Sequence, residues 1–149
     1  MQSEPPLSIL AGKWLLIVED DVALAGMLEE FFSDLGCLVL GPAGTAVAAL
    51  GLLAGQSVDV ALLDVTLPDE RSYVVAERLV ELGVPFVFAT GHQLLPGYAA
   101  PAASVLRKPY RPPEVIRAVE EAFSSHADKT RRRASAAQNA VRYRQGEST

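Results

Sequence analysis

The sequence has few cysteines, few histidines and no long apolar run, and each shortage excludes a class of protein. A single cysteine, Cys37, cannot form an internal disulfide, which favours a reducing compartment. It lies in the apolar run 37–40, so we interpret it as a small core residue rather than a reactive thiol. Neither His92 nor His126 has metal-site spacing to this cysteine. No stretch approaches the roughly 20 apolar residues that span a bilayer, and no signal peptide is evident, so we expect a cytoplasmic protein.

Charge of the two signs is unevenly distributed along the chain. Its 149 residues are enough for one compact domain. Residues 1–124 contain 7 Lys and Arg against 16 Asp and Glu, a net charge of −9, whereas residues 125–149 contain 6 against 2, a net charge of +4. We therefore predict a leader at residues 1–12, a domain at residues 13–124 and a separate basic tail at residues 125–149.

The basic tail has no apolar face that a domain could bury. Its cations stand among Ala, Ser and Gln, so we expect a disordered, solvated segment. A weak electrostatic contact with nucleic acid or with an acidic protein is the alternative. Nothing here resembles a helix-turn-helix, and 25 residues are too few for a usual output domain. We predict no sequence-specific DNA binding and no membrane partner.

Strand-length apolar runs alternate with helical patterns over the acidic domain. The expected strands cover residues 14–18, 38–40, 58–65, 85–89 and 104–106. The expected helices are one that contains Leu24, Leu28, Phe31 and Leu35, followed by helices at 45–54, 72–82 and 113–123. This alternation predicts an α/β fold with a doubly wound, five-stranded parallel sheet and right-handed crossovers. Two prolines and a glycine in residues 92–101 predict that the fourth helix is reduced.

Polar residues stand where four of these strands end. They are Glu19, Asp20 and Asp21 after the first strand, Asp64 at the third, Thr90 at the fourth and Lys108 at the fifth. Each has an ordinary explanation when taken alone: a helix cap, a turn, a strand residue or a surface cation. Ligands bind beyond the carboxyl ends of the strands in open parallel sheets, and the conjunction of these residues at that edge favours a site.

The carboxylates at this edge require a counter-charge. Two of them about 4 Å apart repel by roughly 4 kcal/mol at an effective dielectric near 20. Lys108 offsets part of the repulsion, and a divalent cation would offset the rest. Oxygen-only ligands indicate Mg²⁺ rather than zinc. We expect Asp20, Asp64 and a backbone carbonyl near Thr66 to hold the ion, and Glu19 to act through water.

A metal beside a carboxylate suggests phosphoryl transfer, which needs little beyond positioning and charge neutralisation. Asp64 is the expected nucleophile. Lys108 would neutralise one phosphoryl oxygen, and the Thr90 hydroxyl would bond another. Asp21 is assigned to the start of the first helix as its cap.

This arrangement resembles the receiver domain of two-component response regulators. The likeness covers residues 13–124 and rests on the segments 16–21, 62–65, 108–109 and on Thr90. It implies a flavodoxin-like fold and phosphorylation of Asp64 by a histidine kinase or phosphotransfer protein. It also implies a signalling module with an unknown downstream protein, which catalyses only its own phosphorylation and dephosphorylation and is no enzyme in the usual sense.

A narrower likeness is to the FATGUY subgroup of single-domain receivers. It rests on residues 85–91 and 64–67, with Glu70 and residues 72–76 after them. His92 stands where that subgroup usually has a tyrosine or a similar residue. Membership implies a role in phosphorelay or stress-response signalling.

The chain departs from ordinary receivers in two places. Val105 stands where they have an aromatic residue three positions before the lysine, so the usual coupling between Thr90 and that aromatic residue is missing. The segment 91–103 is short and rich in Gly, Pro and Ala, which suggests a switch that acts by ordering it.

Two rival hypotheses remain. A phosphatase of the haloacid-dehalogenase type needs a second Asp two residues after the nucleophile, and Thr66 stands there instead. A degenerate receiver would act as a phosphate-independent binding module, but the intact Asp20, Asp64, Thr90 and Lys108 argue against it.

Overall fold

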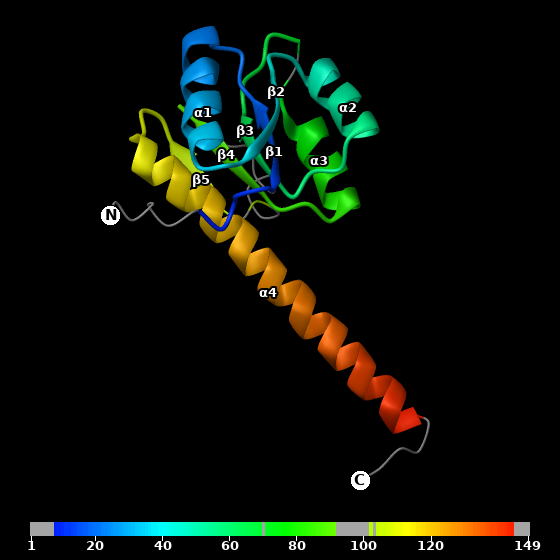
Figure 1. Cartoon of the computed structure of the whole chain (residues 1–149). Coiled ribbons are helices and arrows are strands. Elements are labelled where there is room, and N and C mark those ends of the chain that lie inside the picture. Colours follow the sequence, from blue (N-terminus) through cyan, green and yellow to red (C-terminus); the bar gives the residue numbers. More distant parts are fainter. Residues whose placement is uncertain (1–7, 70, 92–101, 103, 145–149) are drawn as a thin grey trace, which may run out of the picture.

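The computed structural model describes residues 8–69, 71–91, 102 and 104–144 (Figure 1). Strands and helices alternate through most of this length. In chain order the elements are β1 (Trp14–Val18), α1 (Val22–Asp34), β2 (Leu38–Ala43), α2 (Ala46–Gly55), β3 (Val60–Asp64), α3 (Tyr73–Leu82), β4 (Phe86–Thr90), β5 (Ser104–Arg107) and α4 (Pro112–Arg144). The expected elements are thus present, with most ends shifted by one to three residues.

All five strands are parallel and lie in the order β2-β1-β3-β4-β5. Helices α1 and α4 pack on one face of this sheet, and α2 and α3 cover the other. Alternate residues of β1 supply the two cores: Leu15 and Ile17 face α1 and α4, and Leu16 and Val18 face α2 and α3. A strand buried on both faces must be apolar throughout, which is the pattern that predicted this doubly wound fold.

Capping side chains begin two of the helices, and a glycine ends a third. Asp21 caps α1, because its Oδ1 accepts a hydrogen bond of 3.0 Å from the Leu24 backbone N–H. Thr45 caps α2 in the same way. Gly83 ends α3 with φ of 70°, a left-handed conformation that glycine adopts at no steric cost.

The expected leader is wrong for residues 8–12, which belong to the domain. Leu10 is fully buried in the core beneath α1 and α4. The Ser8 hydroxyl donates a 2.6 Å hydrogen bond to Glu120 of α4, and the Gly12 N–H donates to the Gly36 carbonyl. These partners are distant in sequence, so local patterning could not reveal them. Residues 1–7 lie outside the described part.

The expected disordered tail is also wrong, because α4 continues to Arg144. Pro112 and Pro113 stand in its first turn, where proline is tolerated, and no Gly or Pro follows before Gly146. Ala, Arg, Lys and Gln are strong helix formers, so the helix propagates from the packed half beyond the domain (Figure 1). The second half of α4 thus depends on propensity more than on packing.

The expectations for the fourth helix and for an ordering switch concern residues 92–101 and 103, which lie outside the described residues. Among the helices of the described part, none is both long enough and apolar enough to cross a membrane.

Candidate functional site

The sheet register places the polar residues side by side at its carboxyl edge. Glu19 directly follows β1, Asp64 ends β3 and Thr90 ends β4. In the described chain, the buried polar or charged residues are these three and Ser72. Burial of polar groups is costly and burial of charge more so, so two carboxylates and a hydroxyl buried at one edge indicate a constraint other than stability.

Three carboxylates converge at this edge. Glu19, Asp20 and Asp64 each offer an oxygen, and these oxygens all lie within 4.8 Å of one another. Glu19 and Asp64 are buried, whereas Asp20 is exposed, so the cluster opens to solvent on one side. A cavity of about 320 Å³ adjoins it, lined in part by Glu19, Asp20 and Gly44. Oxygen-only donors with an open side fit a hard divalent cation that keeps several waters, as Mg²⁺ does.

Lys108 reaches the cluster from the end of β5. Its Nζ lies 2.7 Å from Oε1 of Glu19 and 3.3 Å from Oδ2 of Asp64. Burial by itself lowers the pKa of Lys108, but its hydrogen bonds and charge contacts with the two carboxylates outweigh burial and raise it. Lys108 is therefore a stable cation at the site.

One carboxylate is difficult to ionise without a further cation. Burial, followed by a hydrogen bond with Asp64, raises the pKa of Glu19 to about 7, and Lys108 opposes the rise. The ammonium thus neutralises only part of the negative charge that the three carboxylates bring together. This supports the expected need for a divalent cation.

The other predicted residues lie around this cluster. The Thr66 N–H donates a 3.3 Å hydrogen bond to Oδ1 of Asp64, and the proposed role of its carbonyl stays a prediction. The Thr90 carbonyl accepts a 2.9 Å bond from the Lys108 N–H, which fixes the two strand ends together. Asp21 caps α1 as predicted, and its N–H donates to Oε2 of Glu19 at 3.3 Å.

Two residues near the site were missed from the sequence. The Asp69 carboxylate accepts hydrogen bonds from the Ala46 and Val47 N–H groups at 3.0 and 3.1 Å, so it caps α2 from 22 or more residues away. No local signal could reveal such a distant cap. Tyr110 follows the Lys108-Pro109 segment, and its buried hydroxyl has no hydrogen-bond partner among the described residues. Burial, and then the charges of Glu19 and Asp64, raise its pKa.

Comparison with known proteins agrees with this geometry. The family model described as "Response regulator receiver domain" matches residues 15–120. The chain belongs to this family. Protein PetR of Rhodobacter capsulatus is 31% identical to this receiver over 107 residues, which are 68% of this chain and 45% of PetR. The Regulator of RpoS of Escherichia coli K12 is 34% identical over 74 residues, 50% of this chain and 22% of that protein. The receiver thus spans less than half the length of these curated relatives.

Solved structures show the same fold. A CheY-like receiver domain from Methanospirillum hungatei matches with a TM-score of 0.73 at 25% identity, covering 78% of this chain and 98% of that one. The non-phosphorylated HemR receiver domain from Leptospira biflexa matches with a TM-score of 0.68 at 29% identity, covering 75% and 94%. The flavodoxin-like, CheY-like fold predicted from the sequence is confirmed.

Proposed function

We propose that this receiver accepts a phosphoryl group on Asp64 in a magnesium-dependent reaction and signals by protein–protein interaction. The donor is a phosphohistidine of a histidine kinase or phosphotransfer protein. The observation that carries the proposal is the convergence on Asp64: two further carboxylates within 4.8 Å and the Lys108 ammonium at 3.3 Å. A carboxylate nucleophile, a cation site and a fixed ammonium are what phosphoryl transfer to an aspartate requires.

In this mechanism Asp20, Asp64 and the Thr66 carbonyl would hold Mg²⁺, Glu19 would act through water, and the ion would supply neutralisation of the phosphoryl oxygens. An Asp64 oxygen attacks the phosphorus, the phosphorus–nitrogen bond breaks, and the leaving imidazole takes up a proton. Lys108 shifts from the carboxylate to a phosphoryl oxygen, and the Thr90 hydroxyl donates to another. Hydrolysis of the acyl phosphate by water reverses the modification, so the protein acts only on itself.

We further propose that this receiver acts as a single-domain protein of the FATGUY subgroup in a cytoplasmic phosphorelay. The segment Phe86–Thr90 is the buried strand β4, so the subgroup's signature residues lead directly into the site at Thr90. Val105 is 39% exposed on β5, which leaves the position of the usual switch residue without an aromatic ring. The readout of phosphorylation therefore differs from that of ordinary receivers.

Two alternatives are less well supported. A phosphate-independent binding module has no need to bury Glu19 beside a second carboxylate, where burial and then the hydrogen bond with Asp64 raise the pKa of Glu19. A phosphatase with a second catalytic carboxylate is disfavoured because the exposed Thr66 stands at the required position. We predict no sequence-specific DNA binding, because nothing in the sequence of the basic tail resembles a helix-turn-helix and 25 residues are too few for a usual output domain.

The test is intact mass after incubation with acetyl phosphate, with and without magnesium, for wild type and Asp64→Asn. Wild type should gain one phosphoryl group only with magnesium, and Asp64→Asn should gain none. Asp69→Asn is the matched control, because it removes a nearby carboxylate that caps α2 and should still be phosphorylated. Equal labelling of Asp64→Asn and wild type would refute the assignment. Failure of wild type with both acetyl phosphate and a panel of phosphorylated kinases would favour the binding module.

A further inference from the structure

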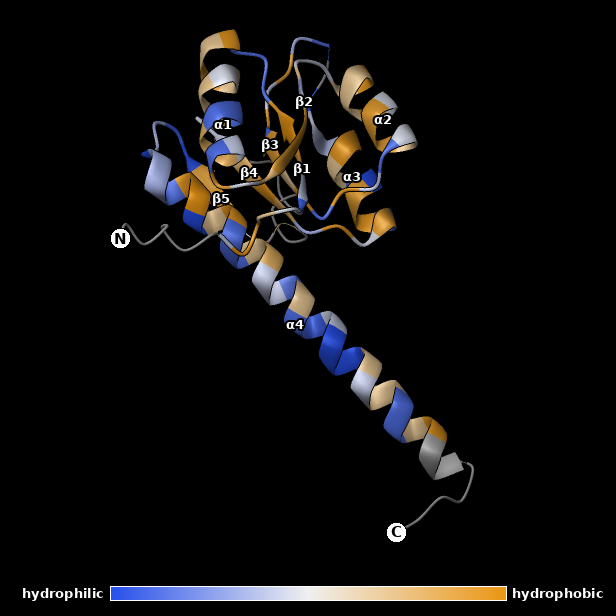
Figure 2. Cartoon of the chain, in the orientation of Figure 1, coloured by the Kyte–Doolittle hydropathy of each residue, from blue (hydrophilic) through white to orange (hydrophobic). Residues whose placement is uncertain are grey.

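The second half of α4 is a basic helix without a partner in the described chain. Every residue from 128 to 141 is exposed, and we call this segment the basic extension. Its cations are Lys129, Arg131, Arg132 and Arg133, and its one acid, Asp128, is paired with Arg131. Figure 2 shows this hydrophilic segment projecting away from the domain. Isolated helices of about 12–15 residues are marginal in water, so packing against another surface would stabilise it.

Its residues are arranged in faces. One side of the helix carries small or apolar residues at spacings of four, three and four. They are Thr130, Ala134, Ala137 and Val141. Arg131 and Arg133 border this side by their helical positions, whereas Arg132 lies opposite to it. A helix in parallel pairing with the same helix of another copy would bring these arginines together, and like charges repel. An acidic surface with an apolar strip would complement both the arginines and this side of the helix.

The domain presents such a surface on α1. Four exposed residues of α1 follow the same spacing of four, three and four: Ala23, Met27, Glu30 and Asp34. Met27 is 46% exposed, which places an apolar side chain beside the two acids. Helix α1 contains three acidic residues and no Lys or Arg. Within the described helices, α1 thus matches the basic extension in charge.

The two surfaces also match in size. With a rise of about 1.5 Å per residue, the 13 residues of α1 and the 14 residues of the basic extension each span roughly 20 Å. They cannot meet within one molecule, because α4 is one continuous helix that leads away from the domain and from α1 (Figure 1). The complementary surface belongs to another molecule.

We propose that the basic extension docks on α1 of a second copy of this chain. Two copies can exchange this contact reciprocally, so that each extension lies on the partner's α1 and the assembly closes as a two-fold dimer. The contact combines opposite charges with apolar side chains on both faces, Met27 on α1 and Val141 on the extension. It does not depend on phosphorylation of Asp64.

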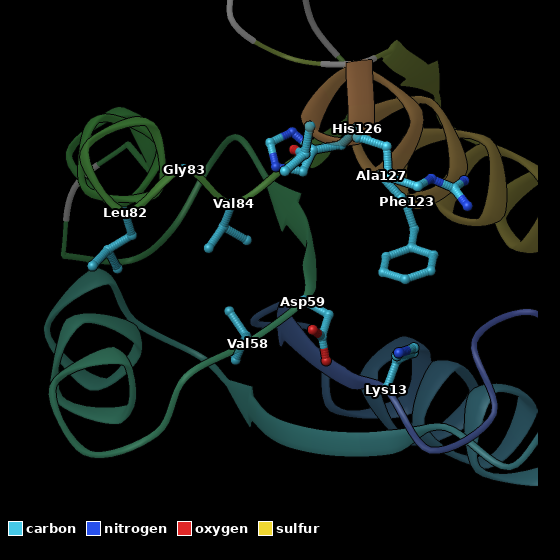
Figure 3. A pocket seen from close by; sticks show the side chains of 11 residues that line it. Lys13, Val58, Asp59, Leu82, Gly83, Val84, Phe123, His126 and Ala127 are labelled. Atoms are coloured by element: carbon cyan, nitrogen blue, oxygen red, sulfur yellow. The ribbon is translucent and has the colours of Figure 1, made fainter. Parts of the chain in front are cut away.

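Two cavities at the start of the basic extension support a docking role. A cavity of about 580 Å³ lies where α4 leaves the domain, between Lys13, Val84, Phe123 and Arg131 (Figure 3). A second cavity of about 420 Å³ lies on the other flank of α4, beside Lys129 and Arg133. Both are lined by cations and apolar residues, with Asp59 as an acid in the first, so cationic and apolar surface continues from the basic extension along α4 to the domain.

The test is sedimentation of the full chain at about 0.05 M and about 0.5 M salt, since charge pairing weakens with ionic strength. Wild type should dimerise at low salt. The pair Arg131→Glu/Arg133→Glu and the pair Glu30→Lys/Asp34→Lys should each weaken dimerisation at least tenfold. An equimolar mixture of the two variants should associate again, because one contact of the mixed dimer then has its native charges and the other has both charges reversed. The control Arg132→Glu/Ser135→Asp/Asn139→Asp changes the net charge by the same amount on the opposite side of the helix and should retain the dimer.

Circular dichroism should show that all variants are folded, since every changed residue is exposed. A monomeric wild type at about 100 μM and low salt would overturn the proposal, because the dissociation constant would then lie well above that concentration. A dimer that both charge variants retain would overturn it as well. Binding of duplex DNA through the same arginines by a monomeric protein would assign the basic extension to nucleic acid instead.

Discussion

The Lys108 ammonium lies closer to Glu19, at 2.7 Å, than to Asp64, at 3.3 Å. The cation therefore neutralises the carboxylate that is least able to reach solvent, since the Glu19 side chain is 3% exposed. Its contact with Asp64 is to Oδ2, whereas Oδ1 of Asp64 accepts a hydrogen bond from the Thr66 N–H. In the proposed reaction Lys108 has only a short distance to move from one oxygen to the next.

Removal of this cation should destabilise the fold. Lys108→Met leaves the buried Glu19 without an ion pair, so we expect a loss of about 1–3 kcal/mol in the free energy of unfolding. Urea denaturation at neutral pH measures it. The control is Arg78→Met, which breaks an exposed ion pair with Glu81 and should cost less than about 0.5 kcal/mol. Equal losses in the two variants would show that the pair at the site contributes no more than a surface pair.

Magnesium should stabilise the protein through Asp20. This residue is exposed, so Asp20→Ala should unfold at nearly the same temperature as wild type without metal. With magnesium at about ten times its dissociation constant, wild type should gain about 1.4 kcal/mol and the variant much less. Thermal unfolding with magnesium, and with EDTA as the control, measures the difference. An identical magnesium response in both proteins would remove Asp20 from the metal site.

Asp69 should stabilise α2 from the loop that follows β3. Asp69→Ala leaves the Ala46 and Val47 N–H groups without their acceptor, so we expect a loss of about 0.5–2 kcal/mol. Asp69→Asn keeps one acceptor oxygen and should lose less. Denaturant unfolding compares the two variants, and amide exchange in the first turn of α2 should accelerate in the same order. Unchanged exchange in Asp69→Ala would contradict the cap.

Cys37 should be unreactive in the folded protein and should make stability depend on alkaline pH. Burial, followed by the charge of Asp59, raises its pKa from 9.0 to about 11. The unfolded thiol ionises first as pH rises, so this contribution is complete below pH 9.0 and is lost as pH rises towards about 11. Cys37→Ala should lose less stability than wild type over that interval. Rapid labelling of native Cys37 by a thiol reagent at pH 8 would contradict the burial that underlies both expectations.

The sequence determined the order of elements and the edge where the site forms. Strands and helices can be recognised within short stretches of sequence, because buried residues repeat with the period of the element itself. Residues 14–18 form such an apolar run, and Leu24 and Leu28 have such a helical spacing. The alternation of strands and helices then implies a parallel sheet. The carboxyl ends of parallel strands meet at one edge of the sheet, so the residues there are expected to lie together even when no contact is known. The sequence therefore predicted that the carboxylates and Lys108 lie together and that Asp21 caps α1, whereas the roles of these residues and of Thr90 in phosphoryl transfer stay predictions.

Only the tertiary structure decided the contacts between distant segments. Leu10 is buried by α1 and α4, Asp69 caps a helix that begins 23 residues earlier, and the Glu19–Lys108 pair joins positions 89 apart. None of these has a periodic signature, because each depends on how elements pack rather than on how one of them is patterned. The length of α4 was missed for the opposite reason: residues 125–144 lack an apolar face, yet helix propensity extends a helix that the domain has already nucleated.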